Sequence, residues 1–199
     1  VFIFGVSMGA LNVQRYLIDF KGKLSVKAAV TLSSPWDATK IAERTKNSAF
    51  FRKVFHSTTM KMFKKDLHCE YFRRLLEKKG IDVEEVLKTE SNYEFDMVYY
   101  CQGIGIRSRQ EYYDMYTSGD RLQEIELPML SMNSRDDLII PFSFVPLDQI
   151  RQNANIFQIN VAGGGHIEYY HGLKCEFWGY EVGLTYLNLF AARQMPLTK

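Results

Sequence analysis

Short, strongly apolar segments alternate with an amphipathic one at the start of the chain, and two further apolar segments lie near its end. Residues 1–4 are rich in β-branched and aromatic side chains, as a buried strand is, and residues 26–32 are predicted to form the next buried strand. Between them, from residue 10 to residue 20, apolar side chains recur at helical spacing. Two further strands are predicted at 128–134 and 156–161. This order predicts an α/β protein with a mostly parallel sheet flanked by helices.

The middle of the chain follows a different pattern. Three helical stretches are predicted there, at 47–65, 67–79 and 83–89, and they interrupt the alternation of strands and helices. After the last strand, a closing helix is predicted from about Cys175 to Arg193. We therefore interpret residues 38–118 as a helical cap inserted over a site built by the α/β core.

The predicted organisation has three parts, an α/β core at 1–37, the helical cap at 38–118 and a second core segment at 119–199. The aromatic and methionine side chains of the cap fit ordinary core packing, and they also fit a lining for an acyl chain. Interleaved lysines such as Lys61 and Lys64 would suit membrane phosphates. The sequence leaves these interpretations open.

A Gly-x-Ser-x-Gly motif, residues 5–9, stands between the first strand and the first helix. This is the context of a nucleophile elbow, a strained turn that lifts a serine hydroxyl clear of the sheet. We expect that bulky side chains at Gly5 or Gly9 would collide with the neighbouring strand or helix. The candidate nucleophile is therefore Ser7.

An acid and a histidine follow at the ends of the last two predicted strands. Asp136 and Asp137 come after the strand at 128–134, and His166 follows three glycines after the strand at 156–161. The order serine, acid, histidine is that of α/β-hydrolases. Asp137 is preferred to Asp136 because it stands four residues before Pro141, within a short turn.

The chemistry assigns a role to each group. Ser7 requires a base, His166 can take and return its proton near neutral pH, and Asp137 would hold the imidazole in one tautomer. The backbone N–H of Met8 is the candidate oxyanion donor. A second donor normally comes from a loop after an early strand, which we expect upstream of this chain.

Composition narrows the function classes. The chain has 199 residues, 46% of them hydrophobic, and a formal net charge of +2, so charge favours neither nucleic acid nor strong membrane attraction. No zinc, P-loop or dinucleotide motif is present, which predicts no metal and no cofactor. No run of 18 apolar residues predicts a membrane span, and no signal peptide is visible. The three cysteines are predicted to be free and mostly buried.

The start of the chain is unusual, because Val1 resembles the middle of a buried strand. A nucleophile elbow normally follows several strands of its sheet. We therefore expect this chain to be the C-terminal part of a longer protein. Of the other histidines, His56 and His68 are assigned to the cap, and His171 is close to the site in sequence but is not expected to take part in the reaction.

These motifs resemble the AB hydrolase-4 family, which includes α/β-hydrolase domain-containing proteins 1, 2 and 3. The resemblance covers nearly the whole chain and is most specific between residues 96 and 137. Residues at the family's spacing are Asp96, Gly105, Glu111, Tyr112, Tyr113, Thr117, Ile125, Pro128, Leu130, Met132, Asp136 and Asp137. The second acid is the fixed one in that pattern, which supports Asp137. Glu168 is a departure, because a Gly-Gly-His-x-Gly-Phe ending is common there.

The resemblance implies a serine hydrolase (a carboxylester hydrolase or lipase) that cleaves phospholipid or acylglycerol esters. It also implies membrane association through a segment before Val1, with the endoplasmic reticulum as a candidate membrane. Two alternatives stay open. One is an acyltransferase in which an alcohol replaces water, and the other is a catalytically silent, lipid-binding protein of the same fold.

Overall fold

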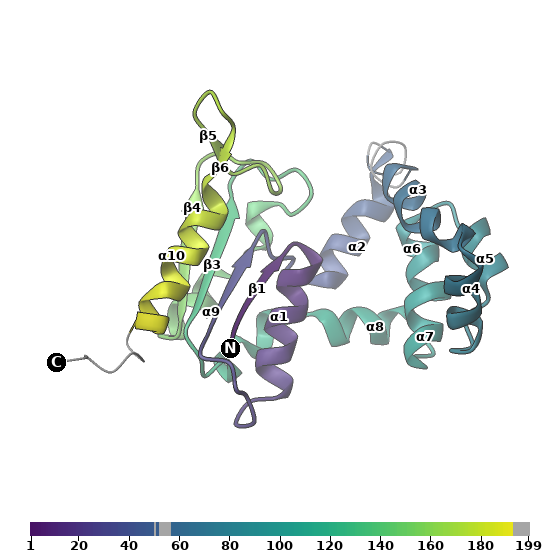
Figure 1. Cartoon of the computed structure of the whole chain (residues 1–199), viewed down its shortest axis with the longest axis horizontal. Helices are drawn as coiled ribbons and strands as arrows, with labels where there is room; N and C mark the ends of the chain where they lie inside the picture. The colour runs from purple at the N-terminus through teal and green to yellow at the C-terminus, as the bar shows by residue number, and fades with distance from the viewer. Residues whose placement is uncertain (50, 52–56, 193–199) are drawn as a thin grey trace. The chain divides into compact units, whose positions relative to one another are not determined.

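A computed structural model of the chain describes residues 1–49, 51 and 57–192 (Figure 1). The chain forms two compact units, unit 1 at Val1–Asp37 and Tyr116–Lys199, and unit 2 at Ala38–Met115. The predicted cap boundaries, 38 and 118, lie close to the limits of unit 2. That the cap covers the site stays a prediction.

The sheet of unit 1 has four parallel strands in the order β1-β2-β3-β4, which confirms the predicted fold class. The strands are β1 (Phe2–Val6), β2 (Ala28–Leu32), β3 (Met129–Ser134) and β4 (Ile156–Val161). The helices of this unit are α1 (Met8–Asp19), α9 (Leu147–Gln152), α10 (Trp178–Ala192) and the short 3₁₀ helices η4 (Gly119–Glu124) and η5 (Phe142–Phe144). Because all four strands run in one direction, their carboxyl ends meet at one edge.

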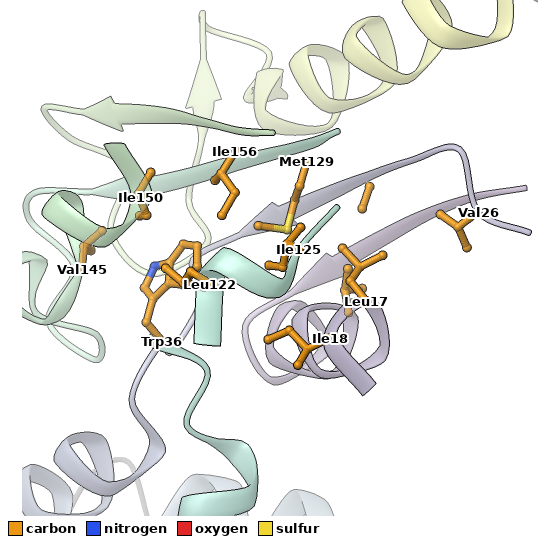
Figure 2. Close-up of a cluster of buried hydrophobic side chains, with 12 residues drawn as sticks. Leu17, Ile18, Val26, Trp36, Leu122, Ile125, Met129, Val145, Ile150 and Ile156 are labelled. Carbon is orange, nitrogen blue, oxygen red and sulfur yellow. The ribbon is translucent and has the colours of Figure 1, made fainter. Parts of the chain in front are cut away.

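Alternate side chains of these strands enter two separate cores. Met129 packs with α1, η4 and α9 on one face, in the cluster drawn in Figure 2. Its neighbour Leu130 packs on the other face with Tyr169 and with Leu187 of α10. Strand side chains alternate between faces with a period of two, so β2 and β3, which are buried throughout, contribute side chains to both cores. Figure 1 shows α1 and α10 on opposite sides of this sheet.

The prediction of a helix from Cys175 is wrong at its first residues. Glu176–Phe177 forms strand β6, which pairs antiparallel with β5 (Tyr170–His171), and α10 begins only at Trp178. Gly172 and Cys175 both have positive φ, at 68° and 51°, and reverse the chain between the two strands. The Tyr170 and Phe177 rings pack edge to face across the pair, with centroids 5.0 Å apart. This hairpin projects from the sheet in Figure 1.

Unit 2 is helical, as the sequence predicts. Its elements are α2 (Ala38–Asn47), α3 (Ser57–Lys65), the 3₁₀ helix η2 (Asp66–His68), α4 (Glu70–Glu77), α5 (Val83–Lys88), α6 (Asn92–Phe95), the π-helix η3 (Asp96–Cys101), α7 (Gln102–Ile104) and α8 (Arg109–Tyr116), which reaches the boundary with unit 1. Its core contains Met60, Leu67, Leu76, Ile81, Val83, Val86 and Phe95. The predicted helix at 47–65 includes residues outside those described, His56 among them. Within the described part of the chain, no helix is long and apolar enough to span a bilayer.

Candidate active site

Ser7 occupies the sharp turn between β1 and α1. Its φ is 52° and its ψ is −120°, a backbone conformation that non-glycine residues rarely adopt. The Ser7 N–H donates to the Leu32 carbonyl oxygen at 2.9 Å, which ties the turn to the end of β2. Strain that persists because neighbouring structure enforces it is typical of functional turns.

The two glycines of the motif have different reasons to be there. A Cβ on Gly5 would lie 2.4 Å from the Gly9 carbonyl oxygen and 2.8 Å from the Cα of Ala10, so only glycine fits. A Cβ on Gly9 would meet nothing within 4 Å. The expectation of a collision is therefore confirmed for Gly5, where the Gly9 and Ala10 backbone makes the close approach, whereas a Cβ alone at Gly9 has room.

His166 lies between Ser7 and Asp137, which are far apart in the sequence. Its Nε2 is 2.7 Å from Ser7 Oγ, and its Nδ1 is 2.9 Å from Asp137 Oδ2. The Asp137 side chain is fully buried, whereas the His166 side chain is 16% exposed. The three side chains thus form one continuous hydrogen-bonded chain at the carboxyl edge of the sheet.

The partners of Asp137 determine where the imidazole proton lies. Its Oδ1 accepts the N–H groups of Ile139 and Ile140, each at 2.8 Å. Its other oxygen, Oδ2, accepts from the imidazole, so the proton of neutral His166 belongs on Nδ1. Nε2 is then unprotonated and accepts the Ser7 hydroxyl proton. This arrangement can activate a serine oxygen as a nucleophile.

Asp136 binds the glycines that precede His166. Its carboxylate accepts from the Ser134 hydroxyl and from the N–H groups of Gly165, at 2.9 Å, and Gly164, at 3.4 Å. The Ser134 hydrogen bond, together with those backbone bonds, lowers the pKa of this carboxyl. Asp136 therefore ties the glycine loop to the end of β3.

Comparisons with known proteins show which chains this one is similar to. The chain is 31% identical over 172 residues to "Phospholipase ABHD3" of Bos taurus, a match that covers 85% of the chain and 40% of that protein. It is 22% identical over 193 residues to "Monoacylglycerol lipase" of Saccharomyces cerevisiae, with 95% and 42% of the two chains covered. The chain belongs to the α/β-hydrolase superfamily. It spans about two-fifths of the length of these relatives.

The fold of this α/β-hydrolase also resembles solved structures. Candida antarctica lipase A matches with a TM-score of 0.56 and 14% identity, over 98% of this chain and 49% of the lipase chain. At that identity the similarity concerns the fold alone. No family model matches the chain.

The remaining candidate residues have separate surroundings. Met8 is the first residue of α1, so its N–H lies at the positive end of that helix dipole. His171 lies on the β5–β6 hairpin, 3.9 Å from a Glu176 carboxylate oxygen. Glu168 is exposed, and its carboxylate lies beside Gly165. Across the described residues, no group of three or more His, Cys, Asp or Glu side chains is placed to hold a metal ion.

The cysteine prediction is half right. Cys69, Cys101 and Cys175 are free thiols, as expected, but only Cys101 is buried. Cys69 lies on the surface of unit 2, where it precedes α4, and Cys175 lies in the exposed turn of the hairpin. Their positions explain the difference, because both stand in short connections that lack apolar cover.

The sequence gives no signal for two polar residues beneath His166. Ser33 and Tyr169 are both fully buried, and their hydroxyl oxygens lie 2.7 Å apart. Ser33 Oγ also donates to the His166 carbonyl oxygen. A left-handed serine directly after a strand, with a φ of 50°, is visible only in the structure.

Unit 2 contains a partly buried carboxyl of its own. Asp96 Oδ2 accepts the Tyr113 hydroxyl at 2.9 Å. Burial raises the pKa of Asp96 to about 6, although Tyr113 and the Arg109 guanidinium both act to lower it. The bond links the π-helix η3 to α8, so it holds two helices of the unit together.

Unit 2 also has a groove with a cationic lining. The residues that line it are Met60, Lys61, Lys64, Lys65 and His68. The ammonium group of Lys64 donates to the carbonyl oxygens of Leu87, at 2.8 Å, and Thr89, so it closes the end of α5. Lys61, Lys65 and His68 are exposed. No acidic side chain lines this groove among the residues described.

Proposed function

We propose that this α/β-hydrolase is a serine hydrolase that cleaves carboxylic esters of lipids through an acyl-enzyme on Ser7. The hydrogen-bonded chain from Ser7 through His166 to Asp137 is the observation that carries the proposal. The phospholipase and lipase names of its relatives support lipid esters, of the phospholipid or acylglycerol type, as the substrate class.

The proposed reaction has two halves. Ser7 Oγ attacks the acyl carbonyl carbon while His166 Nε2 takes the hydroxyl proton, and Asp137 stabilises the imidazolium that forms. The Met8 N–H stabilises the oxyanion of the tetrahedral intermediate. When the intermediate collapses, the ester carbon–oxygen bond breaks and His166 protonates the leaving alcohol. Water, deprotonated by the same histidine, then releases the acid and restores Ser7.

Product analysis separates hydrolysis from acyl transfer. The full-length protein is supplied with an acyl lipid and increasing ethanol, and free acid and ethyl ester are both quantified. Free acid as the main product at low ethanol supports the hydrolase. Ethyl ester as the main product even at low ethanol contradicts hydrolysis and establishes the transferase. Saturable lipid binding with neither product would establish the silent binding protein.

Membrane association is a second part of the proposal. The resemblance implies an anchoring segment outside this chain, and the cationic groove of unit 2 would add attraction for phosphate head groups. Lysines near an anionic membrane surface contribute about 1 kcal/mol each. Replacing Lys61 and Lys65 together by glutamate reverses both charges. The affinity of the protein for anionic vesicles should therefore fall by about 30-fold or more.

The test measures lipid hydrolysis on phosphatidylcholine vesicles with increasing phosphatidylglycerol. A double Lys61→Glu, Lys65→Glu variant is compared with a double Lys78→Glu, Lys79→Glu control, which has the same charge change at exposed positions after α4. If only the Lys61→Glu, Lys65→Glu variant loses the increase of hydrolysis with phosphatidylglycerol, the groove is supported as the membrane-binding surface. Equal losses in both variants would show that only net charge matters, and the groove would then have no special role.

A further inference from the structure

Two buried hydroxyl groups, on Ser33 and Tyr169, lie directly beneath the histidine loop. Ser33 follows the last residue of β2, and its backbone N–H donates to the Met132 carbonyl oxygen of β3 at 2.8 Å. Tyr169 follows His166 by three residues and lies within the core between the sheet and α10. Neither residue touches the reacting atoms, so any role in the reaction must act through His166.

Counting protons gives the direction of each hydrogen bond. The His166 carbonyl oxygen can only accept, so the single Ser33 hydroxyl proton must point to it. Ser33 Oγ then accepts from Tyr169, whose hydroxyl oxygen is 2.7 Å away. The Met132 carbonyl oxygen lies 3.5 Å from the Tyr169 hydroxyl and is the poorer acceptor. The chain therefore runs from Tyr169 O–H to Ser33 O–H to the backbone of His166.

The tyrosine is fixed and keeps its proton. A Cβ on Gly164 would lie 2.7 Å from its ring, and a Cβ on Gly179 of α10 would lie 3.0 Å from its Cβ, so glycines on two sides make room for it. Burial raises the pKa of Tyr169 to about 12, with Asp137 and Asp136 adding to the rise and the Ser33 hydrogen bond opposing it. Its hydroxyl is thus a donor throughout the neutral range.

The end of β2 holds both reacting groups by their backbones. Leu32 accepts the Ser7 N–H at 2.9 Å, and the adjacent Ser33 donates to His166. Gly164 and Gly165 precede the histidine with φ values of 150° and 53°, a conformation that specifies little by itself. The hydroxyl of Ser33 therefore supplies a direct link between the histidine backbone and the strand that holds the nucleophile.

We propose that Ser33 and Tyr169 are positioning residues that set the distance between His166 and Ser7. This inference rests on the proposed function, since it concerns the base of that reaction. A displacement of about 1 Å at a reacting group can reduce a rate by about 100-fold. Loss of the Ser33 hydroxyl should consequently lower kcat with little change in KM.

The test variants are Ser33→Gly and Tyr169→Phe in the full-length protein. Glycine adopts a φ of 50° without strain, so Ser33→Gly removes the hydroxyl without adding a backbone cost to the native turn. Tyr169→Phe keeps the buried ring. With p-nitrophenyl butyrate, we expect kcat to fall about 10- to 100-fold for Ser33→Gly and about 3- to 10-fold for Tyr169→Phe, with KM within about 2-fold.

The double variant separates a connected chain from two independent packing effects. Because Tyr169 acts through Ser33, the double variant should be no slower than Ser33→Gly, within about 2-fold. Multiplied losses would show independent packing effects and overturn the proposal. Unchanged kcat in Ser33→Gly would also overturn it.

A readout independent of turnover is the downfield NMR signal of the His166 Nδ1 proton. Broadening or loss of this signal in folded Ser33→Gly supports the positioning role, even if the parent protein shows no esterase activity and the proposed function fails. An active parent whose Ser33→Gly variant keeps both the signal and kcat leaves the hydrolase in place and overturns the positioning role. A circular dichroism melt of each variant verifies that it is folded.

Discussion

Replacing Gly5 by alanine tests the packing of the nucleophile turn. The added Cβ would lie 2.4 Å from the Gly9 carbonyl oxygen, 2.6 Å from the Gly9 carbonyl carbon and 2.8 Å from the Ala10 Cα. All three atoms belong to the backbone, so no side-chain rotation relieves the contacts. Either β1 or the start of α1 must move.

The size of the effect follows from those distances. Overpacked substitutions cost about 1–3 kcal/mol, and rigid backbone neighbours place Gly5→Ala near the upper end, at about 3 kcal/mol. For a chain of 150–250 residues, each kcal/mol lowers Tm by about 2–4 °C, so we expect a decrease of about 6–12 °C. Activity should fall as well, because the displaced turn carries Ser7.

Gly9→Ala is the matched control within the same motif. Its Cβ would meet nothing within 4 Å, and alanine is favoured over glycine inside helices by up to about 1 kcal/mol. Urea titrations of both variants and the parent give the free energies of unfolding. A Gly5→Ala variant within about 0.5 kcal/mol of the parent, against the expected loss of about 3 kcal/mol, would refute the steric reasoning. So would a Gly9→Ala variant that is destabilised as much as Gly5→Ala.

The remaining predictions concern three carboxyl groups. The pKa of Asp96 is about 6 in the folded chain, above its ordinary value of 3.8. The contribution of Asp96 to the free energy of unfolding is therefore complete below pH 4, where the carboxyl is neutral, and is lost as the pH rises through 6. The stability of Asp96→Asn relative to the parent should therefore rise by up to about 3 kcal/mol between pH 4 and pH 7, and urea titrations that show no such rise would contradict the assignment. Asp137→Asn should lower kcat by about 10⁴-fold, because the amide no longer selects the Nδ1 tautomer of the base. Asp136→Asn should lower kcat by less than about 10-fold, because Asp136 holds only the loop, and steady-state kinetics that rank the two in reverse would overturn the choice of acid.

The α/β core and the order of the site residues could be predicted from sequence because both depend on local patterns. The strands at 26–32, 128–134 and 156–161 are short, mainly apolar segments followed by polar turn residues, and β2, β3 and β4 lie within these ranges. The elbow motif and the glycines before His166 are equally local signals. Each is readable without knowledge of what lies opposite in the fold.

The features that sequence analysis missed depend on partners distant in the chain. Glu176–Phe177 forms a strand because Tyr170–His171 pairs with it. The spacing of apolar residues does not reveal this partner, so the sequence predicts that the following helix includes these two residues. The Ser33 hydroxyl contacts residues more than 130 positions later. The open space beside Gly9 depends on the direction in which α1 leaves the turn, which a glycine at that position does not reveal.

The central claim is that His166 activates Ser7 as a nucleophile. A fluorophosphonate probe tests it most directly, applied to the full-length protein and to its Ser7→Ala variant at equal concentration and with folding verified. We expect the parent to be labelled at Ser7 and the variant to remain unlabelled. A folded parent that is not labelled, or a Ser7→Ala variant labelled as strongly as the parent, would contradict the proposed mechanism.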